Sequence, residues 1–331
     1  MQAPARLLFT SNFESPMKRF LIYCSLFFLP FIISAIPLEL KLRKVPNPYK
    51  FKYEWMQKNA PNVETLVFGS SHTFYGIRPE YLNGNAFSLA NVSQDFRHDH
   101  YLLMYWASKY KHLKTIVYPI SFFSWFSKGL EHGSEWYRCR YYKIYMDCNL
   151  YSDWSIYNLE LSDFNTFRAK LNKLEHEDED PGYDKYGWGN TYKLSTKKYS
   201  EWNDGSEAKA AVKRHTAKDW DNIEANYNII KEMAEFCKSR NIQMVLITTP
   251  CWHTYYDNLD QKQLTKMYEL THHLQKEYNL PYFDYLKDSR FMADDFYDSN
   301  HLSEVGAEKF TKILNENINE IEKSDDKIKQ P

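Results

Sequence analysis

Short apolar segments alternate with helix-length amphipathic stretches along most of this chain, and the alternation limits the folds that it can adopt. The apolar segments are only a few residues long, as buried strands are. Strands that are separated by helices pair in parallel, with helices on both faces of the sheet. We therefore predict an α/β fold with strands at 65–68, 86–91, 115–120, 243–248 and 282–285 and helices at 95–111, 220–240, 260–278 and 303–321.

The first predicted strand runs directly into Gly69, Ser70, Ser71 and His72. A glycine followed by two serines is typical of a tight turn that presents a hydroxyl. In a parallel sheet, ligands bind beyond the carboxyl ends of the strands, where this turn lies. Since a serine hydroxyl is a weak nucleophile until a base takes its proton, Ser71 needs a histidine within hydrogen-bond reach.

A histidine with a suitable carboxylate occurs late in the sequence, in the segment from Asp298 to His301. A spacing of three residues in a turn lets the Asp298 carboxylate accept a hydrogen bond from one imidazole nitrogen while the other faces the serine. Ser303 then has the position of an N-cap for the last predicted helix. Each motif alone is common, but both lie in loops at the same predicted edge of the sheet, in the chain order Ser, Asp, His.

These two motifs resemble the first and last blocks of the SGNH, or GDSL-type, hydrolases and acyltransferases. That family has Gly-Asp-Ser after its first strand and Asp-x-x-His before its last helix. The resemblance implies a three-layer, flavodoxin-like parallel sheet, with Ser71 as nucleophile, His301 as base and Asp298 orienting the histidine. It covers roughly residues 62–121 and 216–320. The Gly-Ser-Ser variant behind an apolar N-terminal segment looks most like the branch that includes the D-alanyl transfer protein of teichoic acid modification and the alginate O-acetyltransferases.

The chain departs from this family in the blocks that stabilise the developing oxyanion. The family's second block supplies a glycine amide, but here the stretch after the second strand is Asn91-Val92-Ser93. The third block supplies an asparagine side chain, but here the stretch is Pro119-Ile120-Ser121. One such donor contributes about 3 kcal/mol. We expect the backbone amides of Ser71 and Ser93, with the Asn91 side chain, to act as substitutes.

The other histidines each have a structural and a functional interpretation. His72 follows the predicted nucleophile and either lines the substrate pocket or packs inside the fold. His253 follows the fourth strand, and at that edge of the sheet it is a candidate for substrate contact. Four more lie on predicted helices without carboxylate or thiol partners at metal spacing, so we interpret them as surface or packing residues: His98, His100, His272 and His273. We predict neither a metal nor a cofactor.

The N-terminal region contains an uncharged apolar run from residue 20 to residue 38, long enough to cross a bilayer core. Its length and the poor cleavage site at Ser34-Ala35 favour an uncleaved anchor over a signal sequence. Basic residues lie on both sides, so the positive-inside rule does not decide the orientation. We predict a cytoplasmic N-terminus at 1–19, a transmembrane anchor at 20–40, a linker at 41–61, an SGNH-like domain at 62–321 and a polar tail at 322–331.

The segment from about 122 to 217 interrupts the alternation and is rich in aromatic residues. A stretch this long without clear periodicity is usually an inserted subdomain or a lid. The chain has 27 Tyr, 21 Phe and 9 Trp, which suit either stacking on sugar rings or core packing. We take the insertion as a candidate platform for an acyl acceptor. Cys139 and Cys148 lie within it, and pairing between them is an alternative to free thiols.

The net charge is −1, from 42 Lys and Arg against 43 Asp and Glu, and gives no reason to expect nucleic acid as a partner. We predict a membrane-anchored enzyme with an extracytoplasmic catalytic domain, periplasmic or at the cell surface. It would move acetyl or another small acyl group onto or off a cell-surface polysaccharide. The family resemblance also implies an acyl donor delivered by a membrane-embedded partner. The alternatives are a carbohydrate esterase and a catalytically inactive polysaccharide-binding or assembly protein.

Overall fold

The computed structural model describes residues 16–175, 180–197 and 205–329. The expected cytoplasmic N-terminus therefore lies outside the described residues up to residue 15, as does the end of the expected tail at 330–331. The chain divides into two compact units: residues 1–45 with 159–177, and residues 46–158 with 178–331. The second unit contains the sheet and both sequence motifs.

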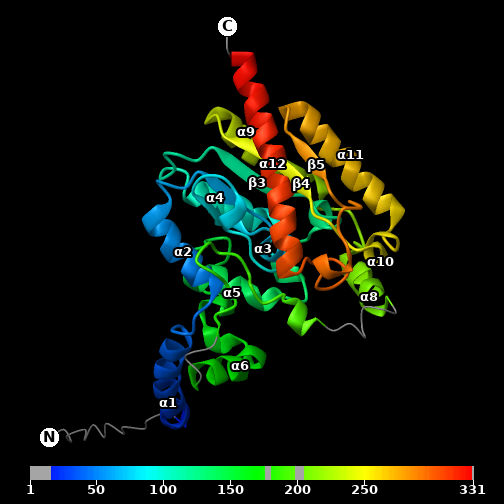
Figure 1. The fold of residues 1–331 in the computed structure, drawn as a ribbon. Coiled ribbons are helices and arrows are strands. Elements are labelled where there is room, and N and C mark those ends of the chain that lie inside the picture. Colours follow the sequence, from blue (N-terminus) through cyan, green and yellow to red (C-terminus); the bar gives the residue numbers. More distant parts are fainter. Residues whose placement is uncertain (1–15, 176–179, 198–204, 330–331) are drawn as a thin grey trace, which may run out of the picture. The chain divides into compact units, whose positions relative to one another are not determined.

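The larger unit is built on a five-stranded, fully parallel sheet in the order β2-β1-β3-β4-β5. Figure 1 shows β3, β4 and β5 of this sheet. Each strand falls within a segment predicted as a strand, so the α/β prediction is confirmed. The chain adds β2 on one side of β1 and β3 on the other, which makes the β1/β3 boundary a topological switch point. The strands are β1 Thr65–Val67, β2 Ala86–Ser88, β3 Thr115–Pro119, β4 Gln243–Thr248 and β5 Tyr282–Asp284.

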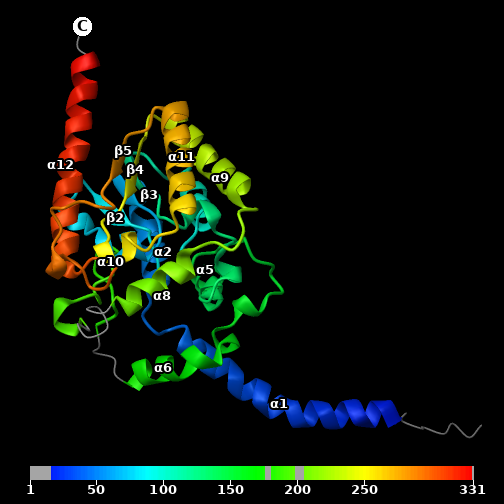
Figure 2. The same cartoon turned by 90° about the vertical axis from the view of Figure 1, so that its right-hand side faces the viewer.

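Side chains of the strands alternate between the two faces of the sheet, as the pleat requires. Leu66 and Ile116 belong to the core on one face, whereas Val67 and Val117 belong to the core on the other. Figure 2 shows α9 and α11 on one side of the sheet and α12 on the other. With the sheet between them, these helices give the predicted three layers. The main helices are α4 Phe96–Tyr105, α9 Ile223–Ser239, α11 Gln261–Tyr278 and α12 Glu304–Lys329.

Local sequence accounts for where several of these helices begin. Asp95 accepts a hydrogen bond from the His98 backbone N–H at 3.1 Å before α4, and Asp260 accepts from Gln263 N–H at 2.8 Å before α11. Such caps satisfy one of the free N–H groups of a first helical turn. Helix α4 ends earlier than predicted because residues 106–109 turn the chain back toward β3. Helix α12 instead continues to residue 329, through most of the segment predicted as a polar tail.

Shorter helices complete the larger unit. Helix α2 lies in the expected linker at 41–61, and it buries Tyr49 and Met56 in the main core. The short α-helices are α2 Pro48–Asn59, α3 Ser71–Gly76, α5 Cys139–Tyr145, α8 Ser206–His215 and α10 His253–Tyr256. The 3-10 helices of this unit are Pro79–Tyr81, Ser124–Phe126, Leu130–His132, Trp136–Arg138, Ile156–Asn158, Leu194–Thr196 and Ala293–Asp295.

Much of the expected insertion at 122–217 contributes to the core of the larger unit. Trp125, Cys139 and Tyr142 are fully buried in the same hydrophobic cluster as strand residues. Cys139 and Cys148 are free, buried thiols, so the alternative of a disulfide between them is not realised. Burial raises the pKa of each of these thiols to about 12, which keeps them protonated.

The smaller unit consists of α1 (Pro16–Leu42), α6 (Phe164–Glu175) and the 3-10 helix Glu160–Ser162. The Glu39 carboxylate accepts hydrogen bonds from the backbone N–H groups of Glu160 and Leu161, both at 3.0 Å. Helix α1 has a window of mean hydropathy 2.2, and none of that window is buried. By length and composition this helix can cross a membrane, either as an anchor or as a signal sequence.

Candidate active site

Ser71 is the first residue of α3, directly after a sharp turn that follows β1. Gly69 in this turn has φ +108°, and a Cβ atom there would lie 2.1 Å from Cγ of Pro119. Only glycine fits such a position. Ser70 is extended, and its carbonyl accepts from the Phe74 backbone N–H at 2.9 Å, which starts the helix. The turn thus delivers Ser71 to the carboxyl edge of the sheet, next to the end of β3.

The segment before α12 folds around the carboxylate of Asp298. Its Oδ1 accepts hydrogen bonds from the backbone N–H groups of Asn300 at 3.0 Å and His301 at 2.8 Å. Both carboxylate oxygens lie 2.9 Å from His301 Nδ1. Ser303 Oγ accepts from the Gly306 N–H at 3.2 Å, which is the N-cap expected for α12. The turn and the helix end together fix the orientation of the imidazole.

His301 connects the two motifs, because its Nε2 lies 2.8 Å from Ser71 Oγ. Burial acts to raise the pKa of Asp298, but the His301 imidazole and the backbone amides outweigh burial and hold this pKa below its usual range. The ionised carboxylate keeps the hydrogen on Nδ1, so Nε2 is available to take the Ser71 proton. In chemical terms, the arrangement is able to activate a serine hydroxyl for attack on an acyl group.

Three tyrosines pack beside the imidazole. The ring of Tyr192 stacks between those of Tyr75 and Tyr297. Its centroid lies 3.7 Å from the Tyr75 centroid and 4.2 Å from the Tyr297 centroid. Tyr192 and Tyr75 also make edge contacts with His301, at 5.3 Å and 6.1 Å between centroids. Stacked rings of this kind restrict the imidazole and exclude water from one side of it. Both faces of Tyr192 are covered, so its ring is unavailable for stacking on a sugar.

Ser71 and His301 line a cleft of about 770 Å³ at the carboxyl ends of the strands. Part of its wall comes from the expected insertion, including Phe126 and Tyr192. A second cleft, of about 920 Å³, lies at the opposite ends of the strands, beside residues such as Thr65. It is larger, but the described residues that line it include neither serine nor histidine. The chemistry of the side chains therefore favours the first cleft as the site.

The structure places the two further groups expected to help with the oxyanion, the backbone amide of Ser93 and the side chain of Asn91, in different surroundings. Ser93 lines the cleft, and its φ of +60° is the left-handed conformation that glycine favours. Its hydroxyl lies 3.3 Å from Glu135 Oε2. Asn91 is fully buried outside the cleft lining, and its Nδ2 donates to Leu89 O at 3.4 Å and Gln94 Oε1 at 3.1 Å. The structure therefore places Ser93 in the lining of the cleft that contains Ser71, but it does not place Asn91 there.

The two histidines considered for substrate contact lie in different surroundings. His72 is buried, with Nδ1 3.1 Å from Ser121 Oγ and Nε2 3.0 Å from Asn300 Nδ2. His253 begins α10, and its side chain is 53% exposed and 3.8 Å from Asp257. It does not belong to the described lining of the cleft. Both ring nitrogens of His72 already have partners, and His253 lies outside the described cleft lining. Neither histidine therefore has a free ring nitrogen in the cleft beside Ser71.

His215 is a cleft residue that the sequence reasoning missed. It ends α8, lines the cleft and places Nδ1 2.7 Å from the Tyr255 hydroxyl. Burial first, and then the neighbouring His301, lower the pKa of His215 to about 3, so this imidazole is neutral. No motif in the sequence marks it, because it reaches the cleft only through the packing of α8 against α10.

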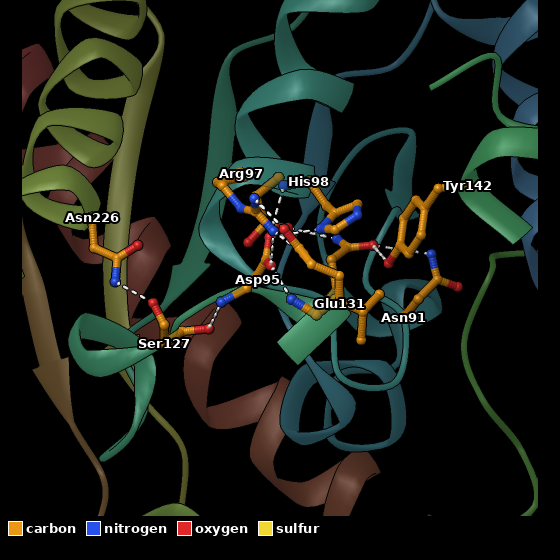
Figure 3. A network of polar contacts seen from close by, with 12 residues as sticks. Asn91, Asp95, Arg97, His98, Ser127, Glu131, Tyr142 and Asn226 are labelled. Carbon is orange, nitrogen blue, oxygen red and sulfur yellow. Dashed lines mark hydrogen bonds and ion pairs between the residues drawn. The ribbon is translucent and has the colours of Figure 1, made fainter. Parts of the chain in front are cut away.

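A second Asp–His pair was also missed, since His98 was considered only as a metal ligand and interpreted as a surface or packing residue. Asp95 Oδ1 lies 2.6 Å from His98 Nδ1, and His98 Nε2 lies 2.8 Å from the Tyr151 hydroxyl. Figure 3 shows Asp95 and His98 within a polar network that also includes Arg97 and Glu131. His98 has no solvent exposure, so its imidazole is internal, whereas Asp95 also lines the cleft that contains Ser71.

Within the described part of the chain, no cluster of three or more His, Cys, Asp or Glu side chains is arranged to hold a metal ion. No protein-family model and no curated protein matches the sequence. Among solved structures, the fold is similar to the crystal structure of a "putative acylhydrolase" from Bacteroides fragilis NCTC 9343. The TM-score is 0.39 at 13% sequence identity, over 81% of this chain and 95% of that one. A similarity this distant does not assign a reaction.

Proposed function

We propose that the protein is a serine-dependent enzyme of acyl ester chemistry, with Ser71 as nucleophile, His301 as general base and Asp298 as the group that orients it. The observation that carries this proposal is the continuous chain of hydrogen bonds, 2.8 Å from Ser71 Oγ to His301 and 2.9 Å from His301 to Asp298. Such a chain lowers the barrier to attack because the proton leaves the hydroxyl as the new bond forms. The acyl group then passes from Ser71 to an acceptor hydroxyl or to water.

The proposed acceptor is a cell-surface carbohydrate, and the proposed acyl group is acetyl or another small group. The cleft of about 770 Å³ is large enough for more than an acetyl ester, and the walls contributed by the insertion include aromatic residues such as Phe123 and Phe126. Transfer also requires water to be kept from the acyl-enzyme. The tyrosine stack beside His301 supports that requirement.

The proposed location of the catalytic unit is outside the cytoplasm, tethered by α1 as an uncleaved anchor. The support is the length and apolar character of α1 and the absence of burial in its most apolar window. Intact mass of the protein recovered from membranes separates the two readings of this helix. Retention of residues 20–38 is expected, whereas their removal would identify a signal sequence.

The central experiment uses the full-length protein in detergent micelles. It is mixed with 4-nitrophenyl acetate, and release of 4-nitrophenol is followed together with the intact mass. We expect one acetyl group on Ser71 in the wild type and none in Ser71→Ala or His301→Ala. His253→Ala is the matched control, because it removes an exposed histidine outside the cleft lining.

The same experiment tests the main alternative. Equal rates of release in the wild type, Ser71→Ala and His301→Ala would overturn the enzyme proposal and favour an inactive polysaccharide-binding or assembly protein. If Ser71 is acetylated, the addition of oligosaccharide acceptors distinguishes transfer from hydrolysis. Acetylated oligosaccharide indicates a transferase, and free acetate alone indicates an esterase.

A further inference from the structure

Ser121 is the second residue after β3, the strand that pairs with β1 and ends beside the turn that leads to Ser71. Its side chain is almost fully buried, at 4% exposure, yet it lines the same cleft as Ser71. Ser121 Oγ lies 3.1 Å from His72 Nδ1, and among the described residues this is its one hydrogen-bond partner. A hydroxyl both donates and accepts, so a serine with one partner still has either its hydrogen or a lone pair to offer a ligand.

The second hydrogen-bond partner of His72, Asn300, determines whether Ser121 offers a ligand its hydrogen or a lone pair. Asn300 Nδ2 is a donor and lies 3.0 Å from His72 Nε2, so Nε2 is the nitrogen without a hydrogen. Burial, followed by the nearby His301 and His215, holds the pKa of His72 well below its usual range, and the ring is neutral. Nδ1 therefore carries the hydrogen and donates it to Ser121 Oγ. The hydrogen of the Ser121 hydroxyl is left free to point into the cleft.

We propose that the Ser121 hydroxyl donates a hydrogen bond to the oxyanion that forms when Ser71 attacks an acyl group, and that His72 and Asn300 position it. The inference rests on the proposed function of Ser71. In the attack, a bond forms between Ser71 Oγ and the carbonyl carbon, the carbonyl π electrons move onto the oxygen, and the Ser71 proton passes to His301 Nε2. As the carbonyl reforms, the bond to the leaving oxygen breaks and His301 gives that oxygen the proton. Ser121 keeps its own proton throughout.

The same geometry argues against Ser121 as a second nucleophile. A base for Ser121 would need an unprotonated nitrogen facing Oγ, but His72 Nδ1 carries a hydrogen as long as Nε2 accepts from Asn300. Ser121 also lies in the stretch after the third strand, where the family that the sequence resembles has an asparagine side chain. A hydroxyl held by the buried His72–Asn300 pair would supply the hydrogen bond that an asparagine amide supplies in that family.

The first test measures the single-turnover rate at which Ser71 of the full-length protein is acetylated by 4-nitrophenyl acetate. Loss of one oxyanion donor slows such a step by roughly 10² to 10³-fold. We expect a loss of that size in Ser121→Ala, with little change in KM because the donor acts in the transition state. Ser239→Ala is the control, since it removes a serine hydroxyl at the exposed end of α9.

The second test changes the hydrogen on His72 and leaves Ser121 in place. In Asn300→Asp, the new carboxylate accepts from Nε2, which moves the hydrogen away from Nδ1. Ser121 then donates to Nδ1 and is withdrawn from the cleft, so acetylation should slow about as much as in Ser121→Ala. If Asn300 acts through Ser121, adding Asn300→Asp to Ser121→Ala should slow the reaction no further.

The outcomes separate this inference from the proposal on which it rests. Wild type that fails to acetylate Ser71 overturns both. Normal acetylation of wild type with Ser121→Ala within threefold of it overturns the role of Ser121 alone. Additive losses in the double variant overturn the positioning role of Asn300, because they show that the new charge acts on His301 directly. Equal melting temperatures for the variants and wild type exclude unfolding as the cause of a loss.

Discussion

The larger unit contains two Asp-x-x-His pairs with the same local geometry and different surroundings. In each pair the aspartate accepts from the backbone N–H of its histidine, at 3.1 Å for Asp95 and 2.8 Å for Asp298. In each, a carboxylate oxygen also lies within hydrogen-bond distance of Nδ1. The spacing of three residues therefore produces the same oriented imidazole twice.

The pairs differ in what the second ring nitrogen meets. His301 Nε2 faces Ser71 in the cleft, whereas His98 Nε2 faces Tyr151 in the interior. The Asp95 carboxylate also accepts from the Leu130 backbone N–H at 2.8 Å, so it ties α4 to the loop before α5. An oriented histidine is thus able either to activate a serine or to connect buried side chains, depending on the partner of its second ring nitrogen.

The largest expected effect is on the pair in the cleft. Asp298→Asn preserves the shape of the turn but no longer fixes the hydrogen on Nδ1, so His301 loses the tautomer that accepts the Ser71 proton. We expect the rate of Ser71 acetylation to fall about 10⁴-fold. The measurement is single-turnover acetylation followed by intact mass, and a loss smaller than tenfold would contradict the role given to Asp298.

The matching change in the internal pair should affect stability and leave chemistry intact. Asp95→Asn weakens the contacts to His98, Arg97 and the Leu130 N–H in a buried network (Figure 3). We expect the free energy of unfolding to fall by about 3 kcal/mol. Urea denaturation measures it, and acetylation of Ser71 at an unchanged rate is the control. A 100-fold slower acetylation in a folded variant would show that the internal pair takes part in the reaction.

Removing the third partner of the internal pair should have a smaller effect. Tyr151→Phe leaves the ring in place but takes away the hydroxyl that lies 2.8 Å from His98 Nε2. The buried nitrogen then has no protein partner in the hydroxyl's place, and we expect a loss of about 1 to 2 kcal/mol in the free energy of unfolding. Tyr23→Phe, on the exposed surface of α1, is a control of the same chemistry. Equal stability of Tyr151→Phe and wild type would mean that the hydroxyl contributes nothing.

The smallest effect concerns Asp99, which lies on α4 with His98 and accepts from the Gly69 N–H at 3.1 Å in the turn before Ser71. Burial raises its pKa from 3.8 to about 7. At pH values between 3.8 and about 7, the folded protein keeps a proton on Asp99 that the unfolded chain has released. The stability that this proton contributes therefore decreases as pH rises toward 7 and is lost above about 7. Asp99→Asn removes that dependence.

Urea denaturation at pH 6 and pH 8 measures the Asp99 effect. Wild type should lose about 1 kcal/mol more than Asp99→Asn over this interval. His72 and His215 have lowered pKa values and affect stability in the opposite sense, with losses as pH falls through 6.5. Both histidines are present in wild type and in Asp99→Asn, so their effect cancels in the comparison of the two proteins. Parallel curves for the two proteins would contradict a raised pKa for Asp99.

Much of the fold and part of the site followed from local sequence. The strands were predicted correctly because short apolar runs with turn residues at their ends usually form buried strands in an α/β chain. The turn at Gly69 and the N-cap at Ser303 were expected for the same reason, since neighbouring residues determine both. The expectation of an Asn91 side chain near the oxyanion differs from the structure, because its amide is taken up by Leu89 and Gln94 in the core.

The sequence alone therefore determined the parallel sheet, the apolar α1 and the oriented Asp298–His301 pair, because each depends on periodicity or on contacts within a few residues. Tertiary structure decided which histidine meets a serine, and it brought His215 and the Ser121–His72–Asn300 contacts to the cleft. Those contacts join residues far apart in the chain. Their geometry depends on how β1, β3, α8 and the turn before α12 pack together, and no local pattern encodes that packing.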